Sequence, residues 1–283
     1  MLDVAGAEQL VVIANTGDDL EIYGAYVSPD PDLVTFWLAD AIDERGWGLK
    51  DDTFKVMDGL RQLGVEVWFN LGDRDLALGI ERARLLAAGA RLTDAQAALT
   101  AAVGVSARVL PMSDDPVRTR VLAHGRWWPF QAFMIKARAE GPVDEVTFAG
   151  APSATATPEA LEAITNAQAI VIGPSNPVIS IGPILATGGI RDTLIRSAAP
   201  VVAVSPIVQG DVLKPATAPF MAWAGYELTA TGVAGFYGGL LDGLVADQQT
   251  DLLPVLRTDM LMADADGRRR LAEEALEFAL ALR

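Results

Sequence analysis

The sequence predicts an α/β fold: a doubly wound, mostly parallel sheet of the Rossmann-like kind, with a small helical and aromatic subdomain. Short apolar runs alternate with segments that carry apolar residues at helical spacing, which is typical of strands joined by crossover helices. The apolar runs also break into polar turns rich in Asp, Asn, Ser and Gly. Because ligands of such sheets bind beyond the carboxyl ends of the strands, we expect the functional residues in these turns.

Two apolar runs in the first part of the chain predict strands that end in acidic turns. Residues 9–14 break into the turn NTGDD, and residues 65–69 break into the turn NLGDRD. A further strand is expected at Val109 and Leu110, before the turn PMSDDP, and a short one after it through Val121. Helical spacing of apolar residues predicts the intervening helices at residues 31–42, 52–63, 76–88 and 93–102.

The middle of the chain holds the expected subdomain, or lid, around residues 117–142. Trp127, Trp128, Phe130 and Phe133 lie close together there. Two roles fit them: a cover over a planar ligand, or an ordinary aromatic core, which is the more common role of such residues. We otherwise treat the whole chain as a single α/β domain.

The alternation of strands and helices resumes after this region. A strand at residues 143–148 and a helix at residues 158–166 precede a strand at residues 169–172, which breaks into the loop GPSNP. A further strand at residues 201–204 ends at Ser205. The chain is completed by a Gly-rich helical stretch around residues 232–244 and an amphipathic helix at residues 268–282.

Composition excludes several kinds of site. The chain has no Cys, which rules out disulfides, iron–sulfur clusters, thiolate zinc sites and a cysteine nucleophile. Its single His, His124, rules out a His-rich metal site, and we expect it to be structural or solvated because no acid lies beside it. Oxygen ligands for a hard cation are the natural expectation.

The charge balance favours a small-molecule ligand. There are 22 Lys and Arg residues against 37 Asp and Glu residues, a net charge of −15, which disfavours a nucleic-acid partner. A phosphorylated ligand would then need backbone N–H groups, a few Arg or Lys side chains and a divalent cation to offset that charge. Neither a signal-peptide pattern nor an apolar run of membrane-spanning length is present, so we expect a cytoplasmic protein without a membrane partner.

Four carboxylates follow the first strand within a short stretch. Asp18 and Asp19 lie in the NTGDD turn, and Asp30 and Asp32 lie in the segment SPDPD at residues 28–32. Paired acids at the end of a strand suit an oxygen-preferring cation such as Mg²⁺. The alternative is that these residues cap turns and helix N-termini, as Asp commonly does.

Two further turns offer groups that bind anions or polar rings. Arg74 lies between Asp73 and Asp75, a layout that orients the guanidinium toward a phosphate or a polar ring edge, or else forms a surface ion-pair turn. The GPSNP loop at residues 173–177 offers backbone N–H groups and a hydroxyl to an anion. It is not a Walker loop, because the Gly-Lys-Ser/Thr ending is missing.

Taken together, these turns resemble the 2-phospho-L-lactate transferase family, whose members build the deazaflavin coenzyme F420. The strings that carry the resemblance run in order along nearly the whole chain, and the long Ser-Asn-Pro string is specific. They are NTGDD at residues 15–19, SPDPD at 28–32, RGWG at 45–48, LGDRD at 71–75, LPMSDDPV at 110–117, IGPSNPVISIGPIL at 172–185 and VAVSPIV at 202–208.

The resemblance implies a reaction in which the terminal ribityl hydroxyl of 7,8-didemethyl-8-hydroxy-5-deazariboflavin attacks a phosphate that bears a lactyl, enolpyruvyl or glyceryl acid group. The donor is linked to guanosine diphosphate, and GMP is released. The resemblance also implies Mg²⁺ as cofactor and a homodimer. Phosphoryl transfer depends on charge neutralisation and in-line positioning more than on a strong nucleophile, which agrees with the acidic turns and anion-binding loops.

The resemblance also assigns site residues. Asp18, Asp19 and Asp32 would hold or face the metal; Asp32 and Asp19 are the expected catalytic residues, with Asp32 the contact or base for the attacking hydroxyl. The residues expected to line the deazaflavin pocket are Asn70, Asp73, Arg74, Met112, Ser113 and Asp114. Those expected on the guanosine phosphate side are Ser175, Asn176, Ser205 and Lys214.

The start of the chain departs from the family. Family members begin with a strand, a Gly-rich phosphate loop and a helix, and these are missing ahead of Asn15. We expect the true start to lie upstream, because a doubly wound sheet without an inner strand would expose apolar surface. Two alternative functions remain: a non-catalytic nucleotide-sugar-binding regulatory protein of the same superfamily, and a structural subunit whose site has decayed.

Overall fold

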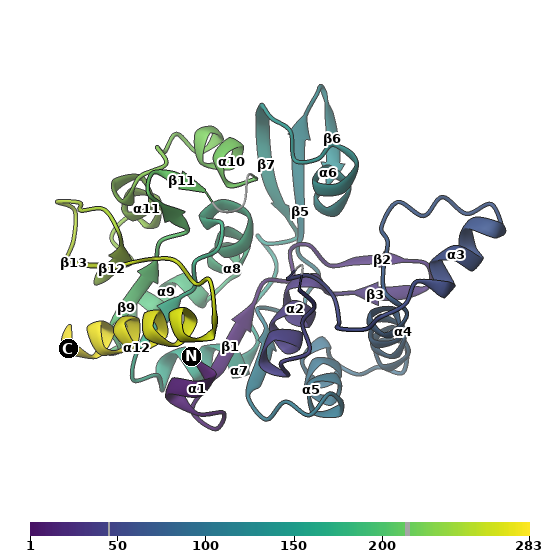
Figure 1. Cartoon of the computed structure of the whole chain (residues 1–283), viewed down its shortest axis with the longest axis horizontal. Coiled ribbons are helices and arrows are strands. Elements are labelled where there is room, and N and C mark those ends of the chain that lie inside the picture. The colour runs from purple at the N-terminus through teal and green to yellow at the C-terminus, as the bar shows by residue number, and fades with distance from the viewer. Residues whose placement is uncertain (45, 213–215) are drawn as a thin grey trace.

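Parallel strands form the centre of the molecule in the computed structural model (Figure 1). The structure describes residues 1–44, 46–212 and 216–283. One sheet holds β8 (Ile170–Ile172), β9 (Val201–Val204), β12 (Gly243–Ala246) and β13 (Val255–Arg257), paired in the order β13-β12-β9-β8. β9 and β12 are buried along their whole length, which explains their almost entirely apolar composition. The predicted α/β class with parallel strands is confirmed.

A second parallel pair carries the first acidic turn. β1 (Val11–Ala14) and β4 (Arg108–Pro111) lie in register, so both strands end at the same level. The pairing continues one step further, because the Met112 N–H donates to the Ala14 carbonyl oxygen (3.0 Å). The NTGDD and PMSDDP turns therefore begin side by side. Two helices pack against this pair, α2 (Pro29–Leu38) and α5 (Leu92–Ala102).

A smaller sheet of three antiparallel strands stands beside the parallel strands (Figure 1). β5 (Arg118–Ala123) lies between β6 (Arg126–Pro129) and β7 (Val143–Ala149), and helix α6 (Phe130–Lys136) packs against it. The strand expected at residues 143–148 is confirmed as β7, but it pairs antiparallel with β5 and does not join the parallel strands. An apolar run indicates a strand but carries no information about the direction of its partner.

The aromatic residues of this region serve mainly as core. Phe133 lies edge-on to Phe220 with ring centroids 5.9 Å apart, and Phe130 is 6.5 Å from the same ring. Trp128 is also buried, whereas Trp127 is 37% exposed. Packing therefore accounts for three of the four aromatic residues that mark this part of the sequence.

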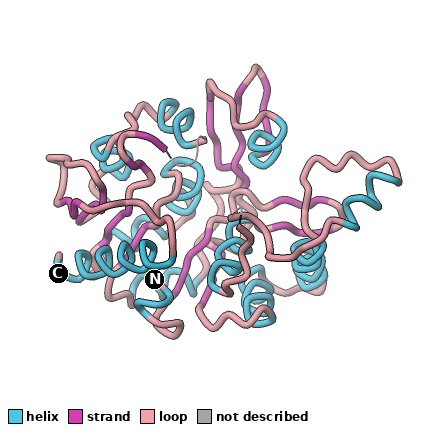
Figure 2. The backbone as a smooth tube through the Cα atoms, in the orientation of Figure 1, coloured by secondary structure: helices cyan, strands magenta, loops and turns pink. Residues whose placement is uncertain are grey.

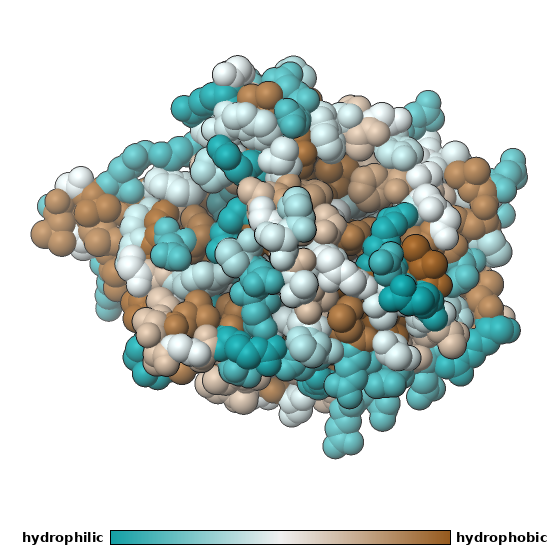
Figure 3. All heavy atoms as spheres, turned by 180° about the vertical axis from the view of Figure 1, so that it is seen from behind, coloured by the Kyte–Doolittle hydropathy of each residue, from teal (hydrophilic) through white to brown (hydrophobic). Residues whose placement is uncertain are grey.

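An arm extends away from the parallel strands (Figures 1 and 2). It consists of the hairpin β2 (Leu20–Ile22) and β3 (Ala25–Val27) with helices α3 (Lys55–Gln62) and α4 (Asp73–Ala87). The far end of the arm carries exposed apolar side chains, among them Leu63 (81% exposed), and forms the brown patch at the left edge of Figure 3.

The strand predicted at residues 65–69 is wrong. In the part of the chain that the structure describes, this segment pairs with no strand. The backbone N–H groups of Trp68 and Phe69 donate instead to the Tyr23 hydroxyl (3.1 and 3.2 Å). The apolar pattern is the same for a buried strand and for an extended segment that packs without joining a sheet, so the sequence could not separate them.

The Gly-rich stretch near the C-terminus hides a strand. Helix α11 (Ala230–Tyr237) ends before residue 244, the expected helix end, and β12 begins at Gly243. Gly238 and Gly239 adopt positive φ angles of 51° and 76°, a conformation that ends the helix and redirects the chain into the sheet. Helix α12 (Ala265–Ala281) then packs against β8 and β9.

The remaining elements are short and connect the strands. They are α1 (Leu2–Ala5), α7 (Pro158–Thr165), the π-helix η1 (Pro177–Ile181), α8 (Gly182–Ala186), α9 (Ile190–Arg196), β10 (Ile207–Val208), β11 (Asp211–Val212) and α10 (Thr217–Trp223). No helix within the described ranges has both the length and the apolarity needed to cross a membrane.

Candidate functional site

Asn15 organises the acidic turn that follows β1. Its Oδ1 accepts a hydrogen bond from the Gly17 N–H (2.7 Å), which closes the turn on itself. Its Nδ2 donates to a carboxylate oxygen of Asp18 and to Asp30 Oδ2 (3.0 Å). Asp30 lies in the first turn of α2, which begins at Pro29. One buried amide therefore brings the carboxylates of Asp18 and Asp30 together at the end of the strand.

Gly17 holds this turn against two other elements. Its carbonyl oxygen accepts a hydrogen bond from the Thr119 N–H in β5 (2.6 Å). A Cβ atom at Gly17 would lie 2.7 Å from Thr119 Oγ1 and 3.1 Å from Pro183 Cβ in α8, which leaves no room for a side chain. The acidic turn therefore lies directly beside α8 (Gly182–Ala186), which follows the GPSNP loop and the short π-helix η1 (Pro177–Ile181).

Asp19 is buried beside these acids and only partly satisfied. Its Oδ1 accepts a hydrogen bond from Ser28 Oγ (2.7 Å), whereas its Oδ2 has no hydrogen-bond partner among the described residues. Burial raises the pKa of Asp19 to about 7, against the opposing effects of the Ser28 hydrogen bond and the charges of Arg118 and Arg82. Buried carboxylate oxygens normally have a hydrogen-bond donor, so an oxygen without one is a candidate contact for a water molecule, a ligand or a cation.

The neighbouring charges make a cation favourable at this position. Burial raises the pKa of Asp18 well above its ordinary value; the charges of Asp30 and Asp19 raise it further, and the hydrogen bond from Asn15 lowers it. Over the described ranges, no three acids or imidazoles are arranged as a metal site by themselves. Mg²⁺ is commonly bound by one or two carboxylates, with water and phosphate oxygens completing its octahedron. Asp18 and Asp30 fit that requirement.

Asp32 lies in the same helix but contacts a different partner. Both of its carboxylate oxygens contact the guanidinium of Arg82 in α4, whose side chain is 0% exposed. Burial raises the pKa of Asp32, while the charge and hydrogen bonds of Arg82 lower it. The negative charge of Asp32 is therefore matched inside the protein.

The similarity of this chain to known proteins spans nearly its whole length, including these acidic turns. A sequence profile of the family described as 2-phospho-L-lactate transferase CofD matches residues 3–265. The chain belongs to the 2-phospho-L-lactate transferase family. That family acts in coenzyme F420 biosynthesis, and the resemblance inferred from the sequence strings is confirmed.

Relatives in the 2-phospho-L-lactate transferase family carry two names. The chain is 37% identical over 281 residues to a 2-phospho-L-lactate transferase of Methanosarcina mazei, with 96% of this chain and 92% of the relative covered. It is 40% identical over 286 residues to a phosphoenolpyruvate transferase of Streptomyces griseus, with 95% and 90% covered. A UPF0052-family protein of Bacillus halodurans shares the fold, with a TM-score of 0.54 at 18% identity over 92% of this chain and 81% of that one.

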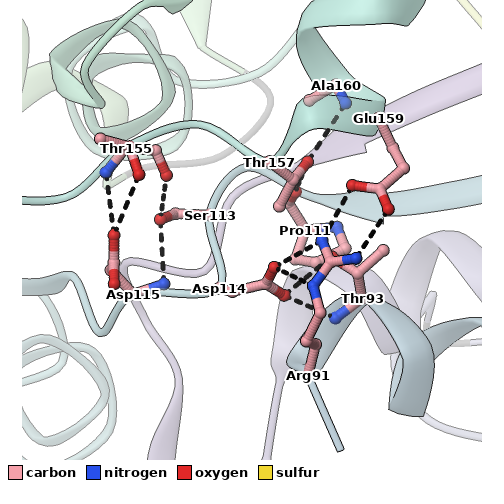
Figure 4. Close-up of polar contacts among 10 residues, drawn as sticks. All are labelled: Arg91, Thr93, Pro111, Ser113, Asp114, Asp115, Thr155, Thr157, Glu159 and Ala160. Atoms are coloured by element: carbon pink, nitrogen blue, oxygen red, sulfur yellow. Dashed lines mark hydrogen bonds and ion pairs between the residues drawn. The ribbon is translucent and has the colours of Figure 1, made fainter.

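In this member of the transferase family, the residues that follow β4 link structural elements (Figure 4). Met112 is fully buried. Ser113 Oγ donates to the Thr155 carbonyl oxygen (2.5 Å) and accepts from the Asp115 N–H (3.0 Å). The polar group of Ser113 is therefore engaged within the protein, next to the end of β1.

Asp114 is engaged in the same way. Its Oδ1 accepts from the N–H and the hydroxyl of Thr93 (both 2.8 Å), which caps the start of α5. Arg91 joins Asp114 to Glu159 of α7, at 2.7 and 2.8 Å (Figure 4). The SDD part of the string thus fastens α5 and α7 to the end of β4.

The three residues expected from the arm have separate surroundings. Asn70 Oδ1 accepts from Arg61 Nη2 (2.6 Å). The Asp73 carboxylate accepts from the first two N–H groups of α3, at 3.1 and 2.9 Å, and so caps that helix. Arg74 donates to the Lys50 carbonyl oxygen (3.1 Å) and borders an open surface hollow of about 380 Å³ whose other walls include Phe36, Leu49 and Leu78.

The residues expected on the nucleotide side include one unsatisfied donor. Asn176 Oδ1 accepts from the N–H groups of Val178 and Ile179 (2.9 and 3.3 Å) and caps η1, while its buried Nδ2 is without a partner in the described part of the chain. Ser175 lies beside it in the loop. Ser205 is buried, and its hydroxyl accepts from the Ile207 N–H (3.1 Å). Lys214, the expected cation, lies outside the described residues.

Sequence reasoning did not assign roles to several residues that build this site. Asn15 and Ser28 lie inside the quoted strings NTGDD and SPDPD, so their positions carried a signal. Arg82 carried a weaker signal, since it follows Leu76 and Gly79 on the buried face of α4 at helical spacing. A charged residue on such a face requires a buried partner, which only the packing identifies.

Proposed function

We propose that this chain transfers a phospholactyl, phosphoenolpyruvyl or phosphoglyceryl group from a guanosine diphosphate-linked donor to 7,8-didemethyl-8-hydroxy-5-deazariboflavin. One structural observation supports this beyond the family. The buried carboxylates of Asp18 and Asp19 gather with the half-buried carboxylate of Asp30 at the end of β1, and Oδ2 of Asp19 has no hydrogen-bond partner within the described ranges. Such a site attracts a divalent cation and, with it, a phosphorylated ligand.

In the proposed reaction, the terminal ribityl hydroxyl of the acceptor attacks the phosphorus that bears the acid group. A new P–O bond forms, the bond from that phosphorus to the bridging oxygen breaks, and GMP leaves with the bridging oxygen and its electron pair. The hydroxyl proton passes to a base. A reaction of this kind depends chiefly on in-line positioning and on neutralising charge at the phosphate oxygens.

We assign separate roles in this reaction to the residues of the NTGDD turn and of the start of α2. Asp18 and Asp30 would hold Mg²⁺, and the cation when bound would neutralise oxygens of the donor diphosphate. Ser28 fixes one oxygen of Asp19, so we assign the role of accepting the hydroxyl proton to Oδ2, which has no hydrogen-bond partner in the described part of the chain. Asp32, the base expected from the sequence, is matched by Arg82, and we assign it a supporting role.

One further feature supports a site for the phosphate groups of the donor. The Nδ2 group of Asn176 is a buried donor suited to a phosphate oxygen of the donor, at the start of a helical segment where anions are favoured.

Turnover by the wild-type chain and by Asp19→Asn tests this proposal. GMP release and deazaflavin product are measured chromatographically with each of the three guanylated donors, with and without Mg²⁺, alongside fluorescence titration of deazaflavin binding. We expect Mg²⁺-dependent GMP release by the wild type and a loss of about 100-fold or more in Asp19→Asn. Binding of nucleotide sugars without turnover of any donor would instead identify a regulatory binding protein.

A further inference from the structure

A buried polar network lies behind the acidic turn and joins four structural elements. Arg82 of α4 is at its centre, with its side chain fully buried. Its Nη1 donates to the Tyr26 carbonyl oxygen of β3 (3.0 Å) and to Asp32 Oδ2 of α2 (3.1 Å). Its Nη2 contacts Asp32 Oδ1 and donates to Gln96 Oε1 of α5 (3.2 Å).

Arg82 reaches this position because α4 packs very closely on β3. Gly79 precedes Arg82 by one helical turn on the same face. A Cβ atom at Gly79 would lie 3.1 Å from Ala25 Cβ and 3.2 Å from the Tyr26 carbonyl oxygen. The missing side chain allows the helix to approach, and the guanidinium then lies within hydrogen-bond distance of the strand backbone.

Gln96 extends the network along α2. Its Nε2 donates to Thr35 Oγ1 (3.2 Å) and to Thr100 Oγ1 (3.1 Å). Thr35 Oγ1 in turn donates to the Pro31 carbonyl oxygen (2.8 Å). The network therefore holds α2 at Asp32 and again one turn later.

The first turn of α2, which this network fixes, and the residue before it supply Asp30 and Ser28 to the cluster of acids at the end of β1. Ser28 donates to Asp19, and Asp30 accepts from Asn15, the amide that also contacts Asp18. A shift or rotation at the start of α2 would therefore separate Asp30 from Asp18. The guanidinium is suited to prevent this, because its planar fork donates two hydrogen bonds to a carboxylate held in one orientation.

Stability alone is a weak explanation for such a pair. Removing two charges from water opposes folding, and well-packed apolar residues often replace a buried ion pair without loss of stability. What apolar residues do not reproduce is the fixed orientation of the carboxylate. The pair therefore contributes chiefly by fixing the orientation of Asp32 and, with it, the position of the start of α2.

We propose that Arg82 is a positioning residue, which fixes the first turn of α2 against the NTGDD turn and so sets the relative placement of Asp18 and Asp30. The proposal rests on the proposed function for the identity of the cation as Mg²⁺. The fixed placement itself depends on the network alone.

Three variants test this role. Arg82→Met/Asp32→Leu replaces the pair by apolar side chains of similar size, Arg82→Met leaves Asp32 unpaired, and Arg84→Met removes an exposed cation two residues further along α4 as a matched control. For each we measure urea unfolding, amide hydrogen exchange at the start of α2, and calorimetric titration with Mg²⁺ alone.

We expect the double variant to stay folded, with a urea midpoint lowered by the loss of the Arg82 hydrogen bonds to the Tyr26 carbonyl and Gln96 Oε1. Relative to amides elsewhere in the chain, those of residues 32–36 in α2 should exchange at least about tenfold faster, and Mg²⁺ should bind about 10–100-fold more weakly. Arg84→Met should match the wild type in all three measurements. Wild-type exchange and Mg²⁺ affinity in the double variant would overturn the proposal. Faster exchange in that variant, combined with no Mg²⁺ binding by the wild type, would support the positioning role and reject the cation of the proposed function.

Discussion

The Asp32→Asn variant separates a catalytic Asp32 from an Asp32 that pairs with Arg82. Asparagine keeps the volume of aspartate but removes the charge, and its amide group would turn a donor toward the guanidinium N–H groups. Arg82 is fully buried, so its charge would lose the carboxylate that is hydrogen-bonded to it, with Asp19 remaining as a more distant negative group. Breaking a buried pair by removing one partner costs about 3–5 kcal/mol. At roughly 2–4 °C per kcal/mol for a domain approaching this size, the melting temperature should fall by about 6–20 °C.

Urea and thermal unfolding measure this loss, and Asp58→Asn provides the control. Asp58 pairs with Arg61 on the exposed surface of α3 at 2.8 Å, so its loss should change the free energy of unfolding by less than about 1 kcal/mol. An Asp32→Asn protein with wild-type stability and no turnover would refute this reasoning. It would return Asp32 to the reacting groups, as the resemblance of the sequence first implied.

Three further predictions concern other parts of the site. Asn176→Asp keeps the oxygen that caps η1 but replaces its free donor by an anionic oxygen, so the calorimetric Kd for GMP should rise at least about tenfold; an unchanged Kd would place the nucleotide elsewhere. Gly17→Ala should destabilise the chain by about 1–3 kcal/mol in urea, because its Cβ would lie 2.7 Å from Thr119 Oγ1, and wild-type stability would mean that the turn is looser than described. Arg91→Met removes the side chain whose hydrogen bonds lower the pKa of Glu159 from 4.5 to about 2. The folded-state pKa of Glu159 lies below its unfolded value, so the ion pair stabilises the protein fully above pH 4.5 and loses its effect as the pH falls toward 2. The difference in urea midpoint between the wild type and the variant should therefore shrink over that range. A constant difference would contradict the pairing.

The parallel strands were largely predictable because their signal is local. β1, β8 and β9 are apolar runs bounded by turn residues, and the structure places each within two residues of its predicted ends. β12 was missed since its first residue, Gly243, belongs to a Gly-rich stretch whose apolar spacing fits a helix. The direction of β7 was missed because strand pairing depends on how distant segments meet, which no single run encodes.

The sequence predicted which segments contribute residues to the candidate site, but it did not predict which partner each of those side chains contacts. The strings NTGDD, SPDPD and LPMSDDPV mark segments that meet at the end of β1, whereas LGDRD lies in the arm, and several polar groups of the quoted strings serve the scaffold. Asp114 caps α5 and Asp73 caps α3, each across a long sequence separation. A distant cap looks like a site residue in the sequence, because the helix start that it satisfies lies elsewhere in the chain.

Asp30 and Asp32 have different surroundings, and their spacing in the sequence already indicates that they face different sides of a helix. Pro29 at the first position of α2 is a typical helix start, so SPDPD predicts a helical turn rather than a flat acidic loop. Residues two apart on a helix point to nearly opposite sides, so these two carboxylates could not both face one cation. One had to turn toward the acidic loop and the other toward the interior, and the interior one required a buried cation. Which cation it meets was beyond the sequence, because the contact depends on the close approach of α4 that Gly79 allows.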